Sequence, residues 1–470
     1  MSIQLYNSLT RAKEPLPSPS EKKTLKIYTC GVTVYDQSHI GHARSLYVFD
    51  VVRRYFQYRG YDVKFVRNIT DVDDKIIKKA KETNKAFEEV VKENIEMYRK
   101  DLKDLGIRPA DVEPRATENI PDMIKDIEGL VEKGYAYEVE GDVYFNVKKF
   151  KDYGKLSGQS IEKMMDGVRI DPNEKKKDPL DFALWKESKE GEPSWDSPWG
   201  KGRPGWHIEC SCMSRKFLQT DTLDIHAGGR DLIFPHHENE IAQAESLTGK
   251  PFAQYWMHHG LLTIHGQKMA KSLGNFITIQ DAIKKYGVDE LKFFFLSSHY
   301  ASPIDFSEEK INEARKALER LDILFWKVYE ILKYQKEFPE MGPVDFIEKD
   351  KNGFLEAMDD NFNTPEALGH LFDLVNNTNK FIDQGPVNDQ YIATIFQAVD
   401  TIETFGKEIF GLFQEETNKE LGEEFKAILE QRKEARQNKD YRRSDELREM
   451  LRQKGISVED TKDGQTWRWL

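Results

Sequence analysis

The chain has 470 residues, of which 39% are hydrophobic and 32% are charged, and its formal net charge is −12. This length is too great for one compact core, so we expect two to four globular domains. Eighteen or more consecutive apolar residues occur nowhere, so we expect no transmembrane helix. Because residues 1–20 also lack the apolar core of a signal peptide, the cytoplasm is the expected location.

The acidic charge and the few cysteines exclude two further classes of protein. An acidic chain does not attract nucleic acid through its overall field, so any RNA partner must bind a local basic patch. The three cysteines are Cys30, Cys210 and Cys212. Three cysteines cannot all pair, and a disulfide framework would be denser, which leaves free thiols in a reducing compartment or metal ligands.

The first elements predict the start of a parallel α/β domain. Residues 25–30 are typical of a short strand, and the apolar residues of 42–58 fall at helical spacing. Gly60 ends that helix, and residues 63–66 form a second predicted strand. A strand–helix–strand order of this kind is typical of a parallel sheet. One further helix is expected over residues 73–94.

Residues 115–200 have a different pattern. Glycines separate short predicted strands, and prolines interrupt the second half of the segment repeatedly. We interpret this segment as an insertion between two halves of the α/β domain. The α/β pattern resumes near residue 207 and continues to about 300, with a strand at 223–226 and a helix at 237–247.

The last third of the chain is predominantly helical. From Ser307 to about residue 415, apolar residues recur on one helix face. One more helix is predicted from Phe425 to Gln453, and Gly455 ends it. A small tail with two tryptophans follows.

Four residues distant in the sequence could form a zinc site. Cys30 lies where the first strand ends, and Cys210 belongs to the second half of the α/β domain. If a helix starts at Pro235, His236 and Glu240 are four residues apart and project from one face. Two sulfurs, one imidazole and one carboxylate suit zinc.

Spacing alone leaves alternatives open at this site. It does not choose between His236 and His237, or between Cys210 and Cys212. A buried free cysteine is, moreover, usually a small hydrophobic residue without a metal. The helical spacing of His236 and Glu240 beside an early-helix proline is what favours the metal.

A nucleotide site is indicated by His39-Ile-Gly-His42, at the junction between the first loop and the first helix. A helix N-terminus offers free N–H groups and the positive end of the helix dipole to phosphate. Gly41 would let a nucleotide ring approach the backbone, and His39 and His42 could donate to phosphate oxygens. A motif of only four residues can occur by chance.

The second nucleotide motif is Lys268-Met-Ala-Lys-Ser272. Its two lysines, Lys268 and Lys271, could cover a transferring phosphoryl group, where their charge matters most in the transition state. In isolation, a solvated basic turn is the better interpretation. The two motifs together, in this order, are far more specific than either alone.

These ordered motifs resemble those of the cysteinyl-tRNA synthetases, a family of class I aminoacyl-tRNA synthetases, over essentially the whole chain. One departure is Ala270, at a position that is usually serine in the family, which puts a minor loop contact in doubt. The matching segments are 28–36, 39–42, 68–74, 181–186, 205–211, 234–240 and 268–272.

The resemblance implies a set of site residues. It implies that Lys271 contacts ATP, which would enter with magnesium. The implied ligands of one zinc ion per chain are Cys30, Cys210, His236 and Glu240. The residues implied to line the cysteine–adenylate pocket are Gly31, Thr70, Trp206, His226 and Asp231.

The resemblance also implies an α/β fold class and an order of domains. We expect a Rossmann-type parallel-sheet catalytic domain with an inserted connective domain, followed by a helical bundle and a small C-terminal anticodon-binding domain. The expected parts are the catalytic halves 1–115 and 201–305, the connective insertion 116–200, the bundle 306–415 and the anticodon-binding domain 416–470.

The reaction implied is the activation of L-cysteine with ATP and its transfer to the 3′ end of tRNA(Cys). Serine is almost the same size as cysteine, so pocket shape separates them poorly. Zinc binds a thiolate far better than an alcohol, so no editing domain is expected. A monomer is expected.

Arg436, Arg443 and Trp467 are the candidate contacts to the tRNA; the arginines come from the basic pattern of this region, and Trp467 lies in a segment that looks like the family's anticodon-contact region. The arginines would follow phosphates and the tryptophan would stack on an unpaired base. Acids alternate with the basic residues of this region, so an ion-paired solvated helix is the alternative for many of the charges. For the tryptophans the alternative is packing within a small domain.

Two other functions are compatible with parts of the pattern. Zinc-dependent ligases that join cysteine to an amino sugar resemble this family but lack most of the anticodon module, so residues 415–470 argue against them. A non-catalytic RNA-binding relative would be expected to lose the charged groups of the ATP motifs, all of which are present here.

Overall fold

The computed structural model divides the chain into two compact units, residues 1–321 with 338–412, and residues 322–337 with 413–470. No helix among the described residues is both long and apolar enough to cross a membrane. The structure describes residues 2–160, 164, 175–269, 273–333, 335, 342–385, 387–413, 423–453, 456–461 and 464–469.

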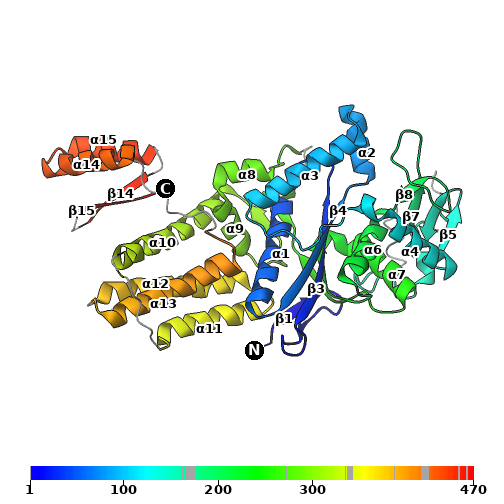
Figure 1. Ribbon diagram of the computed structural model, residues 1–470, viewed down its shortest axis with the longest axis horizontal. Helices are drawn as coiled ribbons and strands as arrows, with labels where there is room; N and C mark the ends of the chain where they lie inside the picture. The colour runs from blue at the N-terminus through cyan, green and yellow to red at the C-terminus, as the bar shows by residue number, and fades with distance from the viewer. Residues whose placement is uncertain are drawn as a thin grey trace. The chain divides into compact units, whose positions relative to one another are not determined.

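A four-stranded parallel sheet forms the centre of the first unit (Figure 1). Its order is β10-β9-β3-β4, so the chain turns from β3 to β4 on one side and later adds β9 on the other. In open α/β sheets, ligands bind at the carboxyl ends of the strands where the order reverses. The elements are β3 (Thr24–Thr33), α1 (Ile40–Tyr58), β4 (Asp62–Thr70), β9 (Leu223–Gly229) and β10 (Ala253–His259).

The α/β class with a parallel sheet is confirmed, but one predicted helix is wrong. The helix expected over 73–94 is two helices, α2 (Asp74–Thr83) and α3 (Phe87–Asp104). Asn84 ends α2 in the left-handed conformation, with φ of 51°, a conformation in which asparagine is tolerated at helix ends. A hairpin of β1 (Gln4–Asn7) and β2 (Ala12–Pro15) precedes the sheet.

The segment between the two halves of the parallel sheet contains an antiparallel sheet of order β5-β6-β7-β8. Apolar side chains from this sheet and from the helix that follows it share one core, which includes Phe145, Trp185 and Met213. The elements here are η1 (Ala116–Asn119), α4 (Ile120–Glu132), β5 (Ala136–Val139), β6 (Asp142–Phe145), η2 (Val147–Lys149), β7 (Phe182–Glu187), β8 (Gly202–Pro204) and α6 (Trp206–Leu218).

The second half of the α/β region contains short elements around the sheet. The regular helix α7 begins at Glu238. The helical backbone before it is broken at Phe234, whose angles are extended, so the turn that leads into α7 follows this break at Pro235, where a helix start was expected. The elements are η3 (Arg230–Leu232), η4 (Ile233–His237), α7 (Glu238–Thr248), β11 (Leu262–Ile264), β12 (Gln267–Lys268), α8 (Ile279–Tyr286), α9 (Val288–Leu296) and β13 (Ile304–Phe306).

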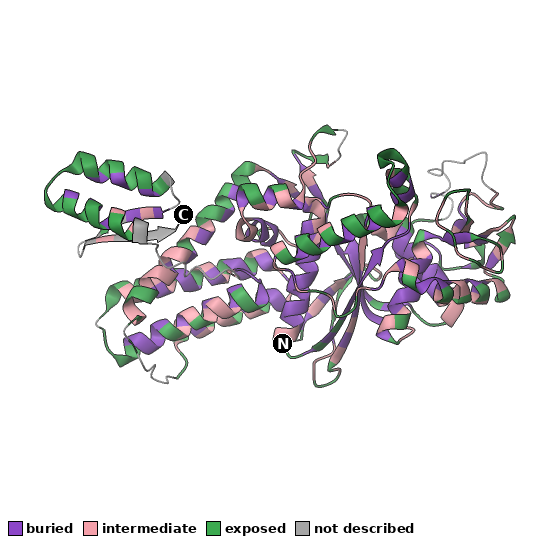
Figure 2. Ribbon diagram, turned by 45° about the horizontal axis from the view of Figure 1, so that its top comes forward, coloured by how far each residue is buried: buried purple, intermediate pink, exposed green. Residues whose placement is uncertain are grey.

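The remaining residues are mostly helical, as predicted. The single helix expected over 425–453 is two helices, because Lys439 between them has a left-handed φ of 60°. Figure 2 colours most of these two last helices as exposed, and most of α1 as buried. The elements are α10 (Glu308–Leu332), α11 (Asp345–Asp359), α12 (Thr364–Gln384), α13 (Asp389–Glu403), η6 (Thr404–Ile409), α14 (Glu423–Gln437), α15 (Tyr441–Gln453), β14 (Ile456–Thr461) and β15 (Gly464–Trp469).

Arg44, fully buried in the first turns of α1, ties this helix to two loops. Its Nη1 donates to the carbonyl oxygens of Gly260 (2.8 Å) and Leu261 (3.0 Å). Its Nη2 donates to those of Tyr300 (3.2 Å) and Ser302 (2.6 Å). Two of these contacts, with Gly260 and Tyr300, are buried, where carbonyl groups need donors, so one guanidinium fixes both loops against the start of α1.

Replacing Arg44 with methionine is expected to lower the free energy of unfolding by about 3 kcal/mol or more, because four loop carbonyl groups, two of them in buried contacts, lose a hydrogen bond from a charged donor. Chemical denaturation measures this change. Arg99→Met is the control, since Arg99 is exposed and its loss is expected to cost less than about 0.5 kcal/mol. Equal stability of the two variants would contradict the role given to Arg44.

Candidate active site and metal centre

The four residues implied as zinc ligands lie together at the carboxyl end of the parallel sheet. Cys30 Sγ lies 3.8 Å from Cys210 Sγ and 3.6 Å from Glu240 Oε1. His236 Nε2 lies 3.0 Å from Glu240 Oε1. One ligand atom from each residue lies within 4.8 Å of the others. Bonds of about 2.0–2.3 Å around a tetrahedral zinc would place ligand atoms at similar separations, so the donor set fits this metal.

Burial and mutual contact set the charges of this cluster. Burial raises the pKa of Cys30 well above its usual value. Burial also acts to raise the pKa of Cys210, but the hydrogen bond from Cys30 and the neighbouring His236 outweigh it and bring this pKa to about 6. For His236, the charges of Glu240 and Cys210 outweigh burial, which lowers the pKa, and raise it to about 10. A buried pocket that stabilises positive charge is suited to a cation.

Neighbouring aromatic rings orient His236. His207 Nδ1 lies 2.9 Å from His236 Nδ1, which leaves the Nε2 of His236 facing Glu240. Trp206 stacks on the His236 ring at 4.0 Å and keeps 37% of its own surface exposed. Such outer hydrogen bonds fix the tautomer and direction of a ligand imidazole. The wall of the cluster that is open to solvent is therefore an aromatic ring.

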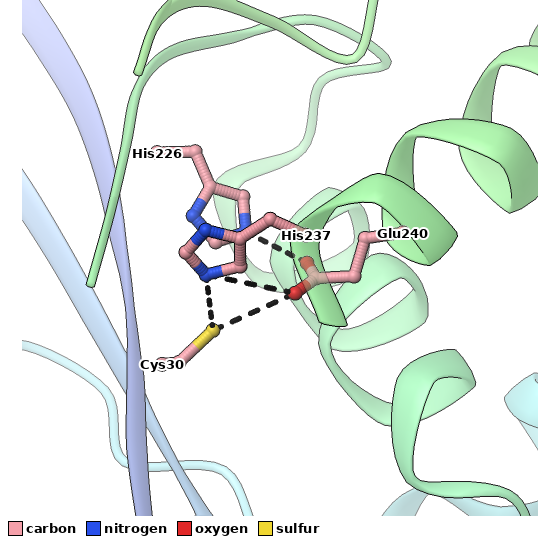
Figure 3. Close-up of side chains that lie close together, drawn as sticks. All are labelled: Cys30, His226, His237 and Glu240. Atoms are coloured by element: carbon pink, nitrogen blue, oxygen red, sulfur yellow. Dashed lines mark hydrogen bonds and ion pairs between the residues drawn. The ribbon is translucent and has the colours of Figure 1, made fainter. Parts of the chain in front are cut away.

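A second group of four possible ligands shares Cys30 and Glu240 with the first and adds His226 and His237 (Figure 3). His226 Nε2 lies 2.7 Å from Glu240 Oε2, and His237 Nε2 lies 3.3 Å from Cys30 Sγ. Both imidazoles are fully buried. The structure thus places His226, a residue implied to bind substrate, directly beside the implied zinc ligands.

A hydrogen-bond network fixes two of the residues implied to contact cysteine. The Gly31 N–H donates to Asn68 Oδ1 (2.8 Å), and Asn68 Nδ2 donates to Thr70 Oγ1 (3.2 Å). The Thr70 hydroxyl in turn donates to Glu209 Oε2 (2.8 Å). Glycine is required at position 31, because a Cβ there would lie 1.6 Å from the carbonyl oxygen of Asn68.

Asp231, the last residue implied to line the cysteine pocket, is exposed in the turn that follows β9. Its carboxylate lies over Gly229, where a Cβ would be 2.4 Å from Asp231 Oδ1. Its negative charge also acts on the His39 imidazole and raises that pKa against the larger effect of burial. Asp231 therefore lies between the metal cluster and the nucleotide motif.

Two histidines cap helix α1 reciprocally. His39 Nδ1 accepts hydrogen bonds from Gly41 N (3.1 Å) and His42 N (3.3 Å), and His42 Nδ1 accepts from His39 N (3.2 Å). Both rings therefore carry their proton on Nε2, and they stack at 3.8 Å. Burial lowers the pKa of His39 to about 4 and that of His42 to about 3. Near neutral pH this pair offers two neutral N–H donors.

Glycine at position 41 has a steric explanation, in addition to the functional one expected from the motif. A Cβ at this position would lie 2.9 Å from the His39 ring, so the glycine makes room for the capping imidazole. The helix start is also joined to the chain beyond the second motif, because Ile40 N donates to Ile277 O (3.1 Å) and Ile279 N donates to Ser38 O (3.0 Å). These bonds bring the two nucleotide motifs together.

Only part of the second motif belongs to the described residues. Lys268 ends β12 and is exposed. Its positive charge lowers the pKa of His39, although burial of the His39 ring lowers that pKa more. Lys271, Ala270 and Ser272 lie outside the described residues. Asn275 Nδ2 donates to Lys268 O (3.3 Å), which links the two sides of the loop.

The residues implied to contact tRNA lie in the second unit. Arg436 forms an ion pair of 2.6 Å with Asp460, and Arg443 forms one of 3.3 Å with Glu446. Both arginines remain partly exposed, at 42% and 49%. The backbone of Trp467 belongs to β15, opposite Val458 in β14, and its side chain lies outside the described residues.

Sequence reasoning missed several residues that support this site. His237 was weighed only as an alternative ligand, and the contacts of Asn68, Glu209 and His207 were not predicted. All four belong to segments that carry the family resemblance, which is a signal that could have found them. His258, bonded through Nε2 to His237 Nδ1 at 2.8 Å, lies outside those segments, and only its position at the end of a strand indicates it.

Three family models match the chain. Residues 17–316 match the model described as tRNA synthetases class I (C) catalytic domain. Residues 353–414 match the DALR domain, and residues 418–468 match the cysteinyl-tRNA ligase anticodon binding domain.

Relatives of known name match over the full length. A cysteine–tRNA ligase of Persephonella marina is 52% identical, with 100% of both chains covered. One of Aquifex aeolicus is 49% identical over 100% of this chain and 99% of its own. Among solved structures, a methionyl-tRNA synthetase of Mycobacterium tuberculosis is similar in fold, with a TM-score of 0.64 and 15% identity over 83% of this chain and 92% of that one.

Replacing Gly31 with alanine is expected to destabilise the protein by at least about 2 kcal/mol, because the new Cβ must push apart the ends of β3 and β4. Thermal unfolding measures the loss. Gly369→Ala is the control, since Gly369 is exposed within α12 and a Cβ there would meet nothing. That change is expected to stabilise the helix by up to about 1 kcal/mol. An unaffected Gly31→Ala variant would show that β3 and β4 separate without cost.

Proposed function

The chain belongs to the cysteine–tRNA ligases, which are class I aminoacyl-tRNA synthetases, and from this premise we propose that Cys30, Cys210, His236 and Glu240 bind one zinc ion that selects the thiol of cysteine. The observation that carries this proposal is the convergence of two sulfurs, one imidazole and one carboxylate from four distant segments on one buried point. The overall reaction does not depend on this metal assignment: the protein joins L-cysteine to tRNA with ATP.

The protein's own groups orient the substrate around that point. Bound zinc supplies a soft acceptor that prefers a thiolate to a protonated alcohol. The Trp206 ring stacks on His236 at the side of the cluster that is open to solvent. On another side of the pocket, Asn68 fixes Gly31 and Thr70 through hydrogen bonds to both residues. Asp231 is exposed nearby and can accept from the substrate ammonium group. A fixed pocket of this kind places the cysteine carboxylate for attack on ATP.

The two nucleotide motifs are proposed to stabilise the transferring phosphate. His39 and His42 donate through their Nε2 protons from the N-terminus of α1, where the backbone of Gly41 leaves space. Lys268 approaches the same helix start, and Lys271 is proposed to contact ATP from the same loop. Charge on the α-phosphate grows in the transition state, so donors fixed in advance there lower the barrier. Magnesium is proposed to accompany ATP.

The C-terminal helices and hairpin are proposed to contact tRNA(Cys) through Arg436, Arg443 and Trp467. The partial exposure of both arginines supports this proposal, although each also has an acidic partner. The match of residues 418–468 to an anticodon-binding model supports the location. Reading of the anticodon by stacking would suit an aromatic side chain.

Three further features are part of the proposal. The proposed domain boundaries are 1–115, 116–200, 201–305, 306–415 and 416–470; of these, the boundary at 415/416 falls between the ranges of two matched family models, 353–414 and 418–468. The protein is proposed to act as a monomer in the cytoplasm. The alternative ligase, which would join cysteine to an amino sugar, is not supported, because the relatives that match throughout are cysteine–tRNA ligases.

The purified protein is expected to contain about one zinc per chain and to catalyse ATP–pyrophosphate exchange with cysteine but not with serine. Glu240→Gln removes a negative ligand, so the zinc content should fall and the KM for cysteine should rise about 100-fold. Elemental analysis and exchange assays measure both. The control is Glu309→Gln, at an exposed position of α10. Full zinc content with unchanged KM in Glu240→Gln would refute the metal assignment.

The capping and phosphate-binding roles of His39 can be separated. Aspartate is a good N-cap residue but repels phosphate, so His39→Asp should unfold at a temperature near that of the wild type while its exchange rate falls about 100-fold or more. His39→Asn, which keeps a cap and a neutral donor, should retain more activity. If His39→Asp kept the wild-type rate, the proposed contact with phosphate would be wrong.

A further inference from the structure

We propose that the active centre has a second zinc seat, formed by Cys30, His226, His237 and Glu240, which holds the ion when a ligand of the first seat is lost. This inference rests on the proposed zinc site, whose own ligands are Cys30, Cys210, His236 and Glu240. The two seats share one sulfur and one carboxylate and differ in the other two ligands. The second seat therefore exchanges a sulfur and an imidazole for two other imidazoles.

The geometry of the second seat resembles that of the first. Cys30 Sγ lies 3.3 Å from His237 Nε2 and 3.6 Å from Glu240 Oε1. The two carboxylate oxygens face different partners, because Oε2 lies 2.7 Å from His226 Nε2 while Oε1 lies 3.0 Å from His236 Nε2. Figure 3 shows the four side chains converging from β3, β9 and the start of α7. Glu240 Oε1 thus faces ligands of both seats, since His237 Nε2 also lies 4.0 Å from it, and Oε2 faces His226 of the second seat.

The two additional imidazoles are held ready to act as ligands. His237 Nδ1 lies 2.8 Å from His258 Nε2, and His258 Nδ1 lies 2.8 Å from Ser8 Oγ. This chain fixes the ring of His237 with Nε2 towards Cys30, as an outer hydrogen bond does for a metal-bound histidine. The His226 ring stacks on Trp256 at 4.6 Å.

The second nitrogen of His226 supports the same inference. Its Nδ1 is buried and has no hydrogen-bond partner among the described residues. In this structure the 2.7 Å contact with the Glu240 carboxylate places the ring proton on Nε2, and a shift of that proton to the unpartnered Nδ1 would free the Nε2 lone pair for a cation.

The charge of the second seat suits a divalent ion. The first seat contributes two thiolates and one carboxylate, which exceed the two positive charges of zinc by one. The second contributes one thiolate and one carboxylate, which balance them. Zinc accepts sulfur, nitrogen and oxygen donors in such mixtures, and a neutral assembly is favourable among largely buried ligands.

The alternative is that His226 and His237 only form hydrogen bonds to the ligands of the first seat. The two interpretations differ in what happens when a ligand outside the shared pair is removed. If the two histidines only support the first seat, then loss of Cys210 or His236 leaves three protein ligands and weakens zinc binding as much as loss of Cys30 or Glu240 does. If they form a seat of their own, four ligands remain.

The test compares zinc content after extensive dialysis in full-length variants. Cys210→Ala and His236→Ala are expected to retain about one zinc per chain, whereas Cys30→Ala and Glu240→Ala, which damage both seats, should lose it. The double variant Cys210→Ala with His237→Ala should also lose it. The control is Cys212→Ala, a buried thiol outside both seats, which should keep its zinc.

Cobalt provides a second readout. The sulfur-to-cobalt charge-transfer absorption of Cys210→Ala should fall to about half that of the wild type, because one thiolate remains instead of two. If Cys210→Ala and His236→Ala are folded by circular dichroism but lose zinc as completely as Glu240→Ala, the second seat does not exist. A wild-type protein without zinc would overturn the proposed function as well, so the two failures are distinguishable.

Discussion

Glu240 carries a carboxylate to a position with no exposure to water, where an uncompensated charge is very costly. The charges of His226 and His236 hold its pKa far below the usual range against the opposing effect of burial. Each of these imidazoles is itself fixed by rings or hydrogen bonds from other elements. The position of one side chain in α7 thereby determines how β3, β9, α6 and the turn before α7 meet at the end of the sheet.

The site combines two kinds of support. On the metal side, a buried network of imidazoles and sulfurs converges from four segments. On the nucleotide side, the start of α1 supplies its own cap through His39 and His42, and the backbone of residues 277–279 pairs with that of 38–40. Arg44 then fixes the first turns of α1 to the loops at 260 and 300. Because α1 is the next helix after β3, the strand that carries Cys30 also leads to the helix start that carries His39 and His42.

Local periodicity was sufficient to predict the parallel sheet, and the order of the motifs was sufficient to predict that Cys30, Cys210, His236 and Glu240 lie close together. The sequence was insufficient where one residue changes the path of the backbone. Asn84 and Lys439 divide predicted helices by adopting left-handed angles, which helical periodicity on either side does not reveal. The roles of His226 and His237 depend on which atoms face Glu240, and that depends on tertiary packing. Spacing could not choose between His236 and His237, and the structure places both within reach of the same carboxylate.

In the C-terminal helices, some of the positive charge is already paired with acidic residues of the protein before any partner binds. Arg432 is fully buried and binds Asp460 through both ends of its guanidinium group, at 2.9 and 3.0 Å, and Arg436 pairs with the same aspartate. The first of these arginines holds α14 to the hairpin and has no surface for a polyanion. Counterion release on RNA binding depends on the cations that reach phosphate, not on those present in the sequence. The ionic-strength dependence of RNA affinity in this region is therefore shallower than a count of its arginines implies.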